Sequence, residues 1–277
     1  MKPSSKILVT SALPYANGPI HLGHLVEYIQ TDIWVRFRKS LGDDIAYICA
    51  DDAHGTPIML KAEELNISPE ELIDQVYDDH KSSFKAYRIS HDNFHTTHSE
   101  ENRILSERIF NALDEKGLIE VKTIEQLYDT SRNLFLSDRY VKGKCPKCFA
   151  EDQYGDNCEV CSATYEAIEL IDPVSVLSNT SPVVKESEHL FFKLSELKQE
   201  IEEWLKDSKI QKPVQNKLSE WLDEDLKDWD ISRDSPYFGF EIPGYKDKFF
   251  YVWFCLLYTS DAADEGLGVD LGGRRII

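Results

Sequence analysis

The order of apolar runs along the first part of the chain constrains the fold most strongly. Residues 7–14, ILVTSALP, and residues 44–51, DIAYICAD, are short and apolar and are bounded by turn residues, which is typical of buried strands. Helical patterns follow them, and these begin at Leu22, Thr56, Ser68 and Ser99. This alternation of strands and helices predicts an α/β fold with a doubly wound parallel sheet, Rossmann-like in its connections.

In folds of this class, ligands bind at the carboxyl ends of the parallel strands. The loops at residues 14–24 and 51–55 each follow one of the predicted strands directly. We therefore expect a binding site where these two loops meet.

The middle of the chain has a different character. Between residues 118 and 230, short strand-like pieces surround four cysteines, and two helical pieces follow. The apolar run KFFYVWF at residues 248–254 then predicts a strand that returns to the sheet. We expect residues 1–117 to form the first half of the α/β domain, 118–230 an inserted connective domain, and 231–254 the return to the first domain.

The four cysteines of the insertion form two CxxC pairs, CPKC and CEVC. These are Cys145, Cys148, Cys158 and Cys161. Four thiolates at this spacing favour one tetrahedral Zn²⁺ in a knuckle at about residues 140–165, and four protein ligands leave no open position, so the zinc would be structural. Two disulfides are the alternative, which the absence of a secretory signal disfavours.

Two histidines lie in the segment YANGPIHLGH, between the first predicted strand and the helix that follows it. If the helix begins near Leu22, the rings of His21 and His24 lie one turn apart at its N-terminus. Free N–H groups and the helix dipole favour a phosphate there, and Gly23 lets a flat ring approach the backbone. On the residues alone, a structural role or a partial metal site remains an equal alternative.

The loop DDAH after the second strand has several readings. Asp51, Asp52 and His54 could form a solvated turn, which we expect first, or ligate a divalent metal, which comes second. The sequence alone names none of them as a metal ligand.

Composition limits the partners. The net charge of −19 does not support broad binding to nucleic acid, so an RNA partner would have to be recognised locally. The chain has no apolar run of 18 residues and no signal-like N-terminus, so we expect no membrane partner and a cytoplasmic location.

The segment PYANGPIHLGH resembles the HIGH signature of class I aminoacyl-tRNA synthetases. The segments ICADDAHGTPIMLKAEEL, DQYGDNCEVC, SEHLFFKL and WDISRDSPYFGFEIPG extend this resemblance to the methionyl-tRNA synthetase family, nearly continuously from residue 6 to 254. The resemblance implies a class I catalytic domain with an inserted zinc knuckle that helps to place the tRNA acceptor end. It also implies the reaction: methionine and ATP, with Mg²⁺, give methionyl-adenylate, and methionine is then transferred to tRNA(Met).

The resemblance also implies site residues. The ATP-binding positions are Tyr15, Asn17, Gly18, His21, Gly23 and His24. The methionine positions are Leu13, Tyr15, Asp52 and Trp253, and the catalytic positions are His21, His24 and Arg233. In this scheme Asp52 holds the substrate ammonium group, and Gly23 leaves room for the adenine.

The sequence departs from the family after Phe254. The family continues with a loop similar to Asp-Ala-Pro-Ile-Gly, whereas residues 255–277 read CLLYTSDAADEGLGVDLGGRRII, which we interpret as a non-native tail without a domain. The Lys-rich KMSKS-type loop and the helical anticodon-binding domain of the family are also missing, so we expect this chain alone to be inactive.

Two other functions remain in view. One is a non-enzymatic zinc-binding fragment, which would need only the four cysteines. The other is a different HxGH nucleotidyl transferase acting on a pantetheine-type substrate, which the inserted cysteines and the ADDAHG loop disfavour.

Overall fold

The structure is a computed structural model that describes residues 6–208, 210–223 and 226–256. Its N-terminal sheet is parallel, in the order β1-β2-β3, and consists of β1 (Lys6–Thr10), β2 (Asp44–Asp51) and β3 (Asn93–Thr96). The predicted first strand therefore ends at Thr10 rather than at residue 14, since the prolines and glycine that follow belong to the loop. The sequence analysis did not predict β3.

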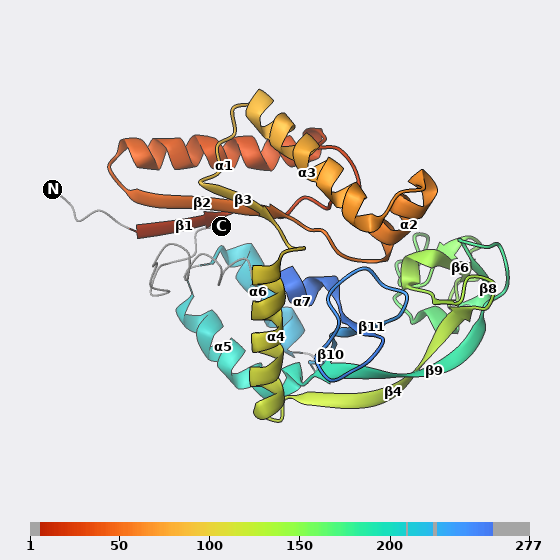
Figure 1. Cartoon of the computed structure of the whole chain (residues 1–277). Helices are drawn as coiled ribbons and strands as arrows, with labels where there is room; N and C mark the ends of the chain where they lie inside the picture. Colours follow the sequence, from red (N-terminus) through yellow and green to blue (C-terminus); the bar gives the residue numbers. More distant parts are fainter. Residues whose placement is uncertain (1–5, 209, 224–225, 257–277) are drawn as a thin grey trace.

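Four helices surround this sheet. They are α1 (Leu22–Ser40), α2 (Thr56–Leu65), α3 (Pro69–Ala86) and α4 (Glu100–Glu115). Helices α1 and α3 lie along one face of the sheet, and α4 lies on the opposite side (Figure 1). Serine side chains cap the N-termini of two of these helices. Ser68 caps α3 in a reciprocal capping box with Glu71, and Ser99 caps α4.

The core beneath α1 and α3 is aromatic. Tyr28 of α1 and Phe84 of α3 contact each other edge to face, with ring centroids 4.9 Å apart, and Tyr47 of β2 is fully buried in the same cluster. Rings of this size bury enough apolar area to fix the two helices on the sheet. The carboxyl ends of β1 and β2 are thereby held in place.

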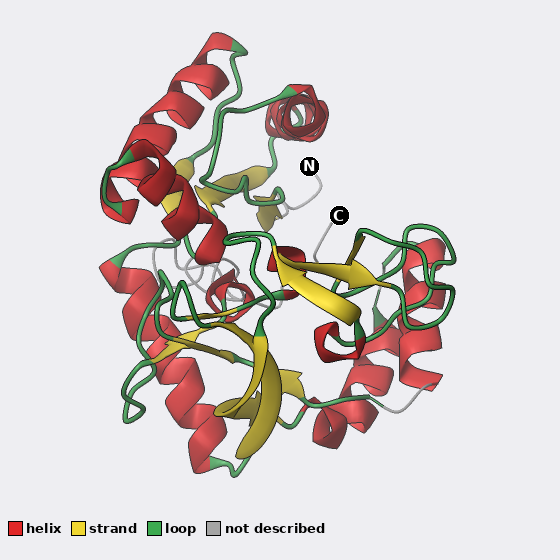
Figure 2. Cartoon of the chain, turned by 90° about the vertical axis from the view of Figure 1, so that its right-hand side faces the viewer, coloured by secondary structure: helices red, strands yellow, loops and turns green. Residues whose placement is uncertain are grey.

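A second sheet is antiparallel, in the order β10-β9-β4-β5. Its strands are β4 (Ile119–Asp129), β5 (Leu134–Phe135), β9 (Val183–Phe192) and β10 (Trp229–Asp230). Strands β4 and β9 form a hairpin-like ladder of ten residue pairs, from Ile119 opposite Phe192 to Tyr128 opposite Val183. The first sheet with α1, α2 and α3 occupies the upper half of both views, and α4 and the β4–β9 ladder lie in the lower half (Figures 1 and 2).

The four cysteines lie at the far end of this ladder. A third sheet, in the order β7-β6-β8, frames them with β6 (Val141–Lys144), β7 (Gln153–Tyr154) and β8 (Ile171–Ser175). Short 3-10 turns η1 (Asp138–Tyr140) and η2 (Ala167–Glu169) complete this region. The two helical pieces predicted after it are α5 (Lys198–Asp207), which follows the turn η3 (Leu194–Leu197), and α6 (Lys212–Asp223).

The apolar run at residues 248–254 differs from its prediction. Only β12 (Lys248–Phe250) is a strand; it pairs with β11 (Ser232–Asp234) and not with the parallel sheet, and helix α7 (Val252–Leu256) begins two residues later. The helical turn places Phe254 on Phe250, with stacked ring centroids 4.9 Å apart. A continuous apolar run carries no periodicity that separates a strand from a buried helix.

Helix α7 includes the first two residues that follow Phe254, Cys255 and Leu256. Cys255 is fully buried in the cluster around Phe110 and Phe250, and burial raises the pKa of its thiol to about 12. The first two residues of the segment at 255–277 therefore pack as part of the fold, and residues 257–277 lie outside the described part of the chain. Among the described residues, no helix is both long and apolar enough to cross a membrane.

Candidate active site

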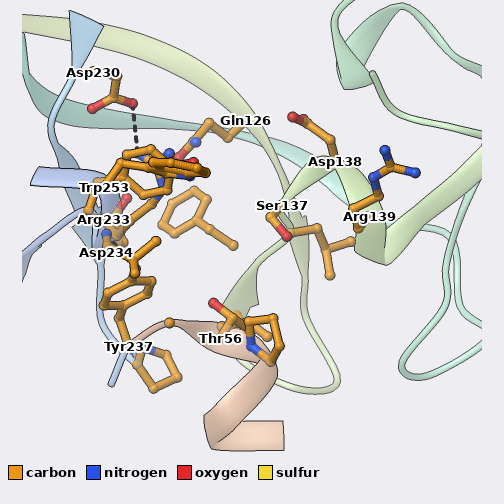
Figure 3. Close-up of a pocket in the computed structure, with 18 of the residues that line it drawn as sticks. Thr56, Gln126, Ser137, Asp138, Arg139, Asp230, Arg233, Asp234, Tyr237 and Trp253 are labelled. Carbon is orange, nitrogen blue, oxygen red and sulfur yellow. Dashed lines mark hydrogen bonds and ion pairs between the residues drawn. The ribbon is translucent and has the colours of Figure 1, made fainter. Parts of the chain in front are cut away.

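A cavity of about 750 Å³ opens at the carboxyl ends of the parallel strands. It faces the β4–β9 ladder on one side and the segment around β11 and α7 on another. Five residues that the sequence assigned to the methionine positions and the catalytic centre line it together: Leu13, Tyr15, Asp52, Arg233 and Trp253. Figure 3 shows Trp253, Arg233 and Tyr237 on one wall, with Asp138 and Arg139 across from them.

The loops after β1 and β2 continue the pairing of these strands. The Asp52 amide donates to the Pro14 carbonyl at 2.9 Å, and the Ala16 amide donates to the Asp52 carbonyl at 2.8 Å. These two bonds form an isolated parallel bridge between Tyr15 and Asp52. The bridge fixes an aromatic ring and a carboxyl group side by side at the mouth of the sheet.

The ring of Tyr15 is held from the next loop. Its hydroxyl donates to the His54 carbonyl at 2.8 Å, and burial raises its pKa. Gly55 lies at φ +115°, and a Cβ built there would come within 2.9 Å of the Tyr15 hydroxyl oxygen. Only glycine leaves room for this position of the tyrosine ring.

The carboxyl group of Asp52 is buried and incompletely paired. Its Oδ1 has no hydrogen-bond partner among the described residues. Burial, together with the charge of Asp51, raises its pKa to about 7, against a hydrogen bond from the His54 backbone. A cation that supplies N–H donors, such as a substrate ammonium group, would strongly stabilise the ionised form of this carboxyl group.

The prediction of a solvated turn for this loop was wrong. Asp51 and His54 are at most 1% exposed. Asp51 pairs with the buried His80, and His54 Nε2 lies 3.0 Å from His98 Nδ1. Burial lowers the pKa of His54 to about 3, so this ring is neutral.

Arg233 is held by its own segment. Its Nη1 donates to the Ser232 carbonyl at 2.5 Å and lies 3.3 Å from Asp230 Oδ2, and its guanidinium lies 3.9 Å from the centroid of the Tyr251 ring. These contacts hold the charged group at the cavity wall.

His189, which also lines the cavity, lies between the carboxylates of Asp230 and Asp234. Its Nδ1 lies 2.8 Å from Asp230 Oδ2, and its Nε2 lies 2.9 Å from Asp234 Oδ2. Burial alone would lower the pKa of His189, but the two carboxylates raise it. Asp234 also pairs with Lys248, so this wall is a compact network of alternating charges.

The sequence analysis missed several residues of this cavity. They are Gln126, Asp138, Arg139, His189, Asp230, Asp234 and Tyr237. Asp230, Arg233 and Asp234 stand together in WDISRD, and that concentration of charge beside Trp229 was the signal that the sequence offered.

The two histidines of YANGPIHLGH lie at the N-terminus of α1, as predicted. Each ring accepts a hydrogen bond through Nδ1 from the other residue's backbone amide at 3.4 Å, and the rings stack with centroids 3.6 Å apart. A Cβ on Gly23 would approach the His21 ring at 3.0 Å, so this glycine permits the stacking. Burial, and then the charges of His21 and His80, lower the pKa of His24.

Most of the predicted ATP positions lie outside the cavity. Among the described residues, no hydrogen bond engages the Nε2 atom of His21 or His24. Neither histidine lines the 750 Å³ cavity, and the same is true of Asn17, Gly18 and Gly23, whereas Tyr15 does line it.

The four cysteine sulfurs converge at one point. Cys145 Sγ lies 3.8 Å from Cys161 Sγ, Cys148 Sγ lies 3.6 Å from Cys158 Sγ, and all four lie within 4.8 Å of one another. Four thiolates around Zn²⁺ at about 2.3 Å would be spaced at about 3.8 Å in a tetrahedron. Backbone amides of Lys147 and Cys148 also point at Cys145 Sγ. This donor set fits a structural zinc ion, whereas disulfides need sulfurs about 2 Å apart.

Comparison with known proteins places this geometry in context. A family model described as tRNA synthetases class I (M) matches residues 7–259. Two solved structures of the Mycobacterium tuberculosis methionyl-tRNA synthetase, both holding methionyl-adenylate, resemble the chain with a TM-score of 0.71 and 21% identity. They match over 96% of this chain and over 48% and 49% of their own length, so the chain spans about half of them.

The match confirms the predicted fold class, a Rossmann-like parallel sheet of the class I type. The family match also reaches past Phe254 into residues 255–259, in agreement with the buried position of Cys255.

Proposed function

The chain belongs to the class I tRNA synthetase (M) family, and from that premise we propose that it carries the methionine site of a methionine–tRNA ligase. The ligase activates methionine with ATP to methionyl-adenylate and transfers it to tRNA(Met) in cytoplasmic translation. One observation carries the proposal: Asp52, an incompletely paired carboxyl group, is bridged to Tyr15 at the wall of a cavity of about 750 Å³ that has room for an amino acid.

In this proposal the cavity holds the amino acid. Leu13, Tyr15 and Trp253 contribute aliphatic and aromatic surface, which suits a soft and weakly polar thioether. Asp52 accepts hydrogen bonds from the ammonium group, whose charge restores the ionised form of this carboxyl group. The substrate carboxylate is then left to face the nucleotide.

ATP, bound with Mg²⁺, would lie at the N-terminus of α1 and along the loop with Asn17 and Gly18. A carboxylate oxygen of methionine attacks the α-phosphorus, the bond to the bridging oxygen breaks, and pyrophosphate leaves. The stacked rings of His21 and His24 present their Nε2 edges, which can donate to the charge that develops on the phosphates. Arg233 would contribute positive charge from the cavity wall, and Gly23 would admit the adenine beside the backbone.

We further propose that one Zn²⁺ is held by Cys145, Cys148, Cys158 and Cys161. A structural zinc ion would tie the two CxxC loops together beside a small local core that includes Val141 and Tyr165. It would stiffen the connective domain, residues 118–230, which helps to place the acceptor end of the tRNA. Residues 1–117 and 231–254 would then form the catalytic part.

Binding of methionine to the purified chain tests the proposal directly. Isothermal titration at pH 8 should show binding of methionine that Asp52→Asn weakens strongly and Trp253→Ala weakens as well. Asp114→Asn, which changes an exposed carboxyl group of α4 outside the cavity, is the matched control and should keep the affinity. A chain that holds one zinc ion but binds no methionine would favour the alternative, a zinc-binding fragment without enzymatic function.

A further inference from the structure

His80 of α3 links two segments that are far apart in the sequence. It is fully buried, its Nδ1 lies 2.7 Å from Asp51 Oδ1, and its Nε2 lies 2.8 Å from the carbonyl oxygen of Gly18. Asp51 is the last residue of β2. Gly18 lies three residues before His21, the N-cap of α1. The ring therefore connects the sheet to the loop that leads into the two stacked histidines.

Both ring nitrogens of His80 face acceptors. A carbonyl oxygen can only accept a hydrogen bond, and an ionised carboxylate can likewise only accept, so with Asp51 ionised both bonds form together only when the ring is an imidazolium with two N–H donors. Burial raises the pKa of Asp51, but the hydrogen bond and the charge of His80 lower it and so favour the ionised pair. Burial alone would lower the pKa of His80, but the hydrogen bond and charge of Asp51 and the Gly18 carbonyl raise it. The second oxygen of Asp51 is buried without a partner, so His80 is the main support of this charge among the described residues.

Other titratable groups also surround the pair. Cys49 lies on β2 beside Asp51, with its thiol pKa raised to about 12 by burial. Tyr28 and His24 face the pair from α1, and Asp79 precedes His80 on α3. Cys49 and Tyr28 stay neutral at physiological pH, so Asp51 and Asp79 are the charges that favour protonation of His80. The charge of His80 in turn contributes to the lowered pKa of His24.

The loop has few other supports at this point. Ala16 is fixed to Asp52 through its backbone, and the helix begins at Leu22. Between them, Ile20 packs against the core cluster around Tyr28, whereas a Cβ built on Gly18 would meet no atom within 4 Å, so no side chain packs on that side of Gly18. The hydrogen bond from His80 is what ties this residue to the core.

We propose that His80 is a positioning residue for nucleotide binding: by donating to the Gly18 carbonyl while paired with Asp51, it fixes the loop that presents His21 and His24. This role rests on the proposed ATP site, but the anchoring of the loop is a property of the protein that needs no catalysis. If His80 lost a proton, the carboxylate would retain the remaining N–H as the stronger acceptor, and a lone pair would face the Gly18 carbonyl. The loop would then be released.

The first test measures the loop itself by backbone ¹⁵N relaxation of the whole chain. In the wild type, the amides of Gly18 and Ile20 should have order parameters near 0.85, and in His80→Phe they should fall below about 0.6. Phe110→Leu, which changes a different core cluster, is the control and should leave both amides unchanged. Unchanged order parameters in a folded His80→Phe would overturn the proposal.

The second test separates positioning from general stability. Binding of a fluorescent ATP analogue should weaken at least tenfold in His80→Phe, while the affinity for methionine should change less than twofold. Equal losses for both ligands would contradict the positioning role, and so would an unchanged affinity for the ATP analogue. If His80→Phe fails to fold, Asp51→Asn serves instead. Loss of the Asp51 charge should lower the His80 pKa, read from ring ¹⁵N shifts, and should move the loss of ATP affinity to lower pH.

The two proposals fail in different ways. A wild-type chain that binds no ATP would refute the nucleotide site, and the relaxation and ring-shift measurements would still decide whether His80 holds the loop.

Discussion

Tyr15, five residues past the end of β1, and Asp52, directly after β2, form an isolated parallel bridge through the Ala16 amide and the Pro14 carbonyl. This bridge sets the aromatic wall of the cavity and its carboxyl group at a fixed separation. The position of each side chain then depends on the loop that follows β2, because the His54 carbonyl accepts from the Tyr15 hydroxyl.

Methionine affinity should depend on the ionisation of Asp52. Its pKa of about 7 means that the group is mostly neutral at pH 6 and mostly charged at pH 8, so affinity for the ammonium group should rise across this interval. Asp52→Asn should weaken binding at pH 8 by about 10- to 100-fold, the size of a charge-assisted hydrogen bond, and should abolish the pH dependence. Calorimetric titrations from pH 5.5 to 8 measure both effects. A wild-type affinity that is flat across this range would contradict the assignment.

The same carboxyl group should lower the stability of the empty protein at high pH. Its pKa is raised from 3.8 to about 7, so the folded state binds the proton more tightly, and this contribution is present below pH 4 and is lost as pH rises through 7. Asp52→Asn should therefore raise the free energy of unfolding at pH 8, by roughly 1–3 kcal/mol, and change it little at pH 4. Urea unfolding at both pH values decides this. A destabilised variant at pH 8 would show that Asp52 has a partner that compensates its charge.

Gly55→Ala should disturb Tyr15 specifically. The substitution adds strain at φ +115° and a contact of 2.9 Å with the Tyr15 hydroxyl, and together these should cost about 2–4 kcal/mol. Gly42→Ala is the control, since it lies at φ +89° with no atom within 4 Å of the added Cβ and reports strain alone.

A double-mutant cycle isolates the contact in this pair. Tyr15→Phe removes the hydroxyl, so Gly55→Ala should cost clearly less in that background than in the wild type. Additive losses in denaturant unfolding would mean that the hydroxyl is not the group that excludes a side chain at Gly55.

The cysteine cluster should bind one zinc ion per chain. Cys158→Ser should reduce the zinc content, measured by elemental analysis, from one to well below one per chain, and should expose residues 140–165 to proteolysis, because the loops lose their main support. Cys49→Ala removes a buried thiol that lies outside the cluster and should retain the metal. Full zinc content in Cys158→Ser would place the metal elsewhere.

The sequence predicted those features that local patterns encode. β2 has the predicted bounds, α2 begins at the predicted residue, and the CxxC spacing identified four sulfurs that do converge. The run at residues 248–254 was misread because a fully apolar segment has no period. β3 is only four residues long, and its pattern was too short to be recognised.

Long-range pairs were the features that local patterns could not supply. His80 contacts Asp51 and Gly18 across separations of 29 and 62 residues, and His189 contacts Asp230 and Asp234 across more than 40. A histidine whose partners lie on other elements has no local signature, so neither His80 nor His189 was predicted. The charged loop DDAH was expected in solvent for the same reason, since its buried partners are distant in sequence.

The β4–β9 ladder has a mechanical consequence. Ten paired residues span roughly 33 Å, and such a ribbon resists bending within its own plane. The cysteine cluster lies at one end of this ribbon. Gln126 and His189, which line the cavity, lie along its length. A macromolecule docked on the cysteine cluster would therefore act on the same ribbon that carries two side chains of the cavity wall.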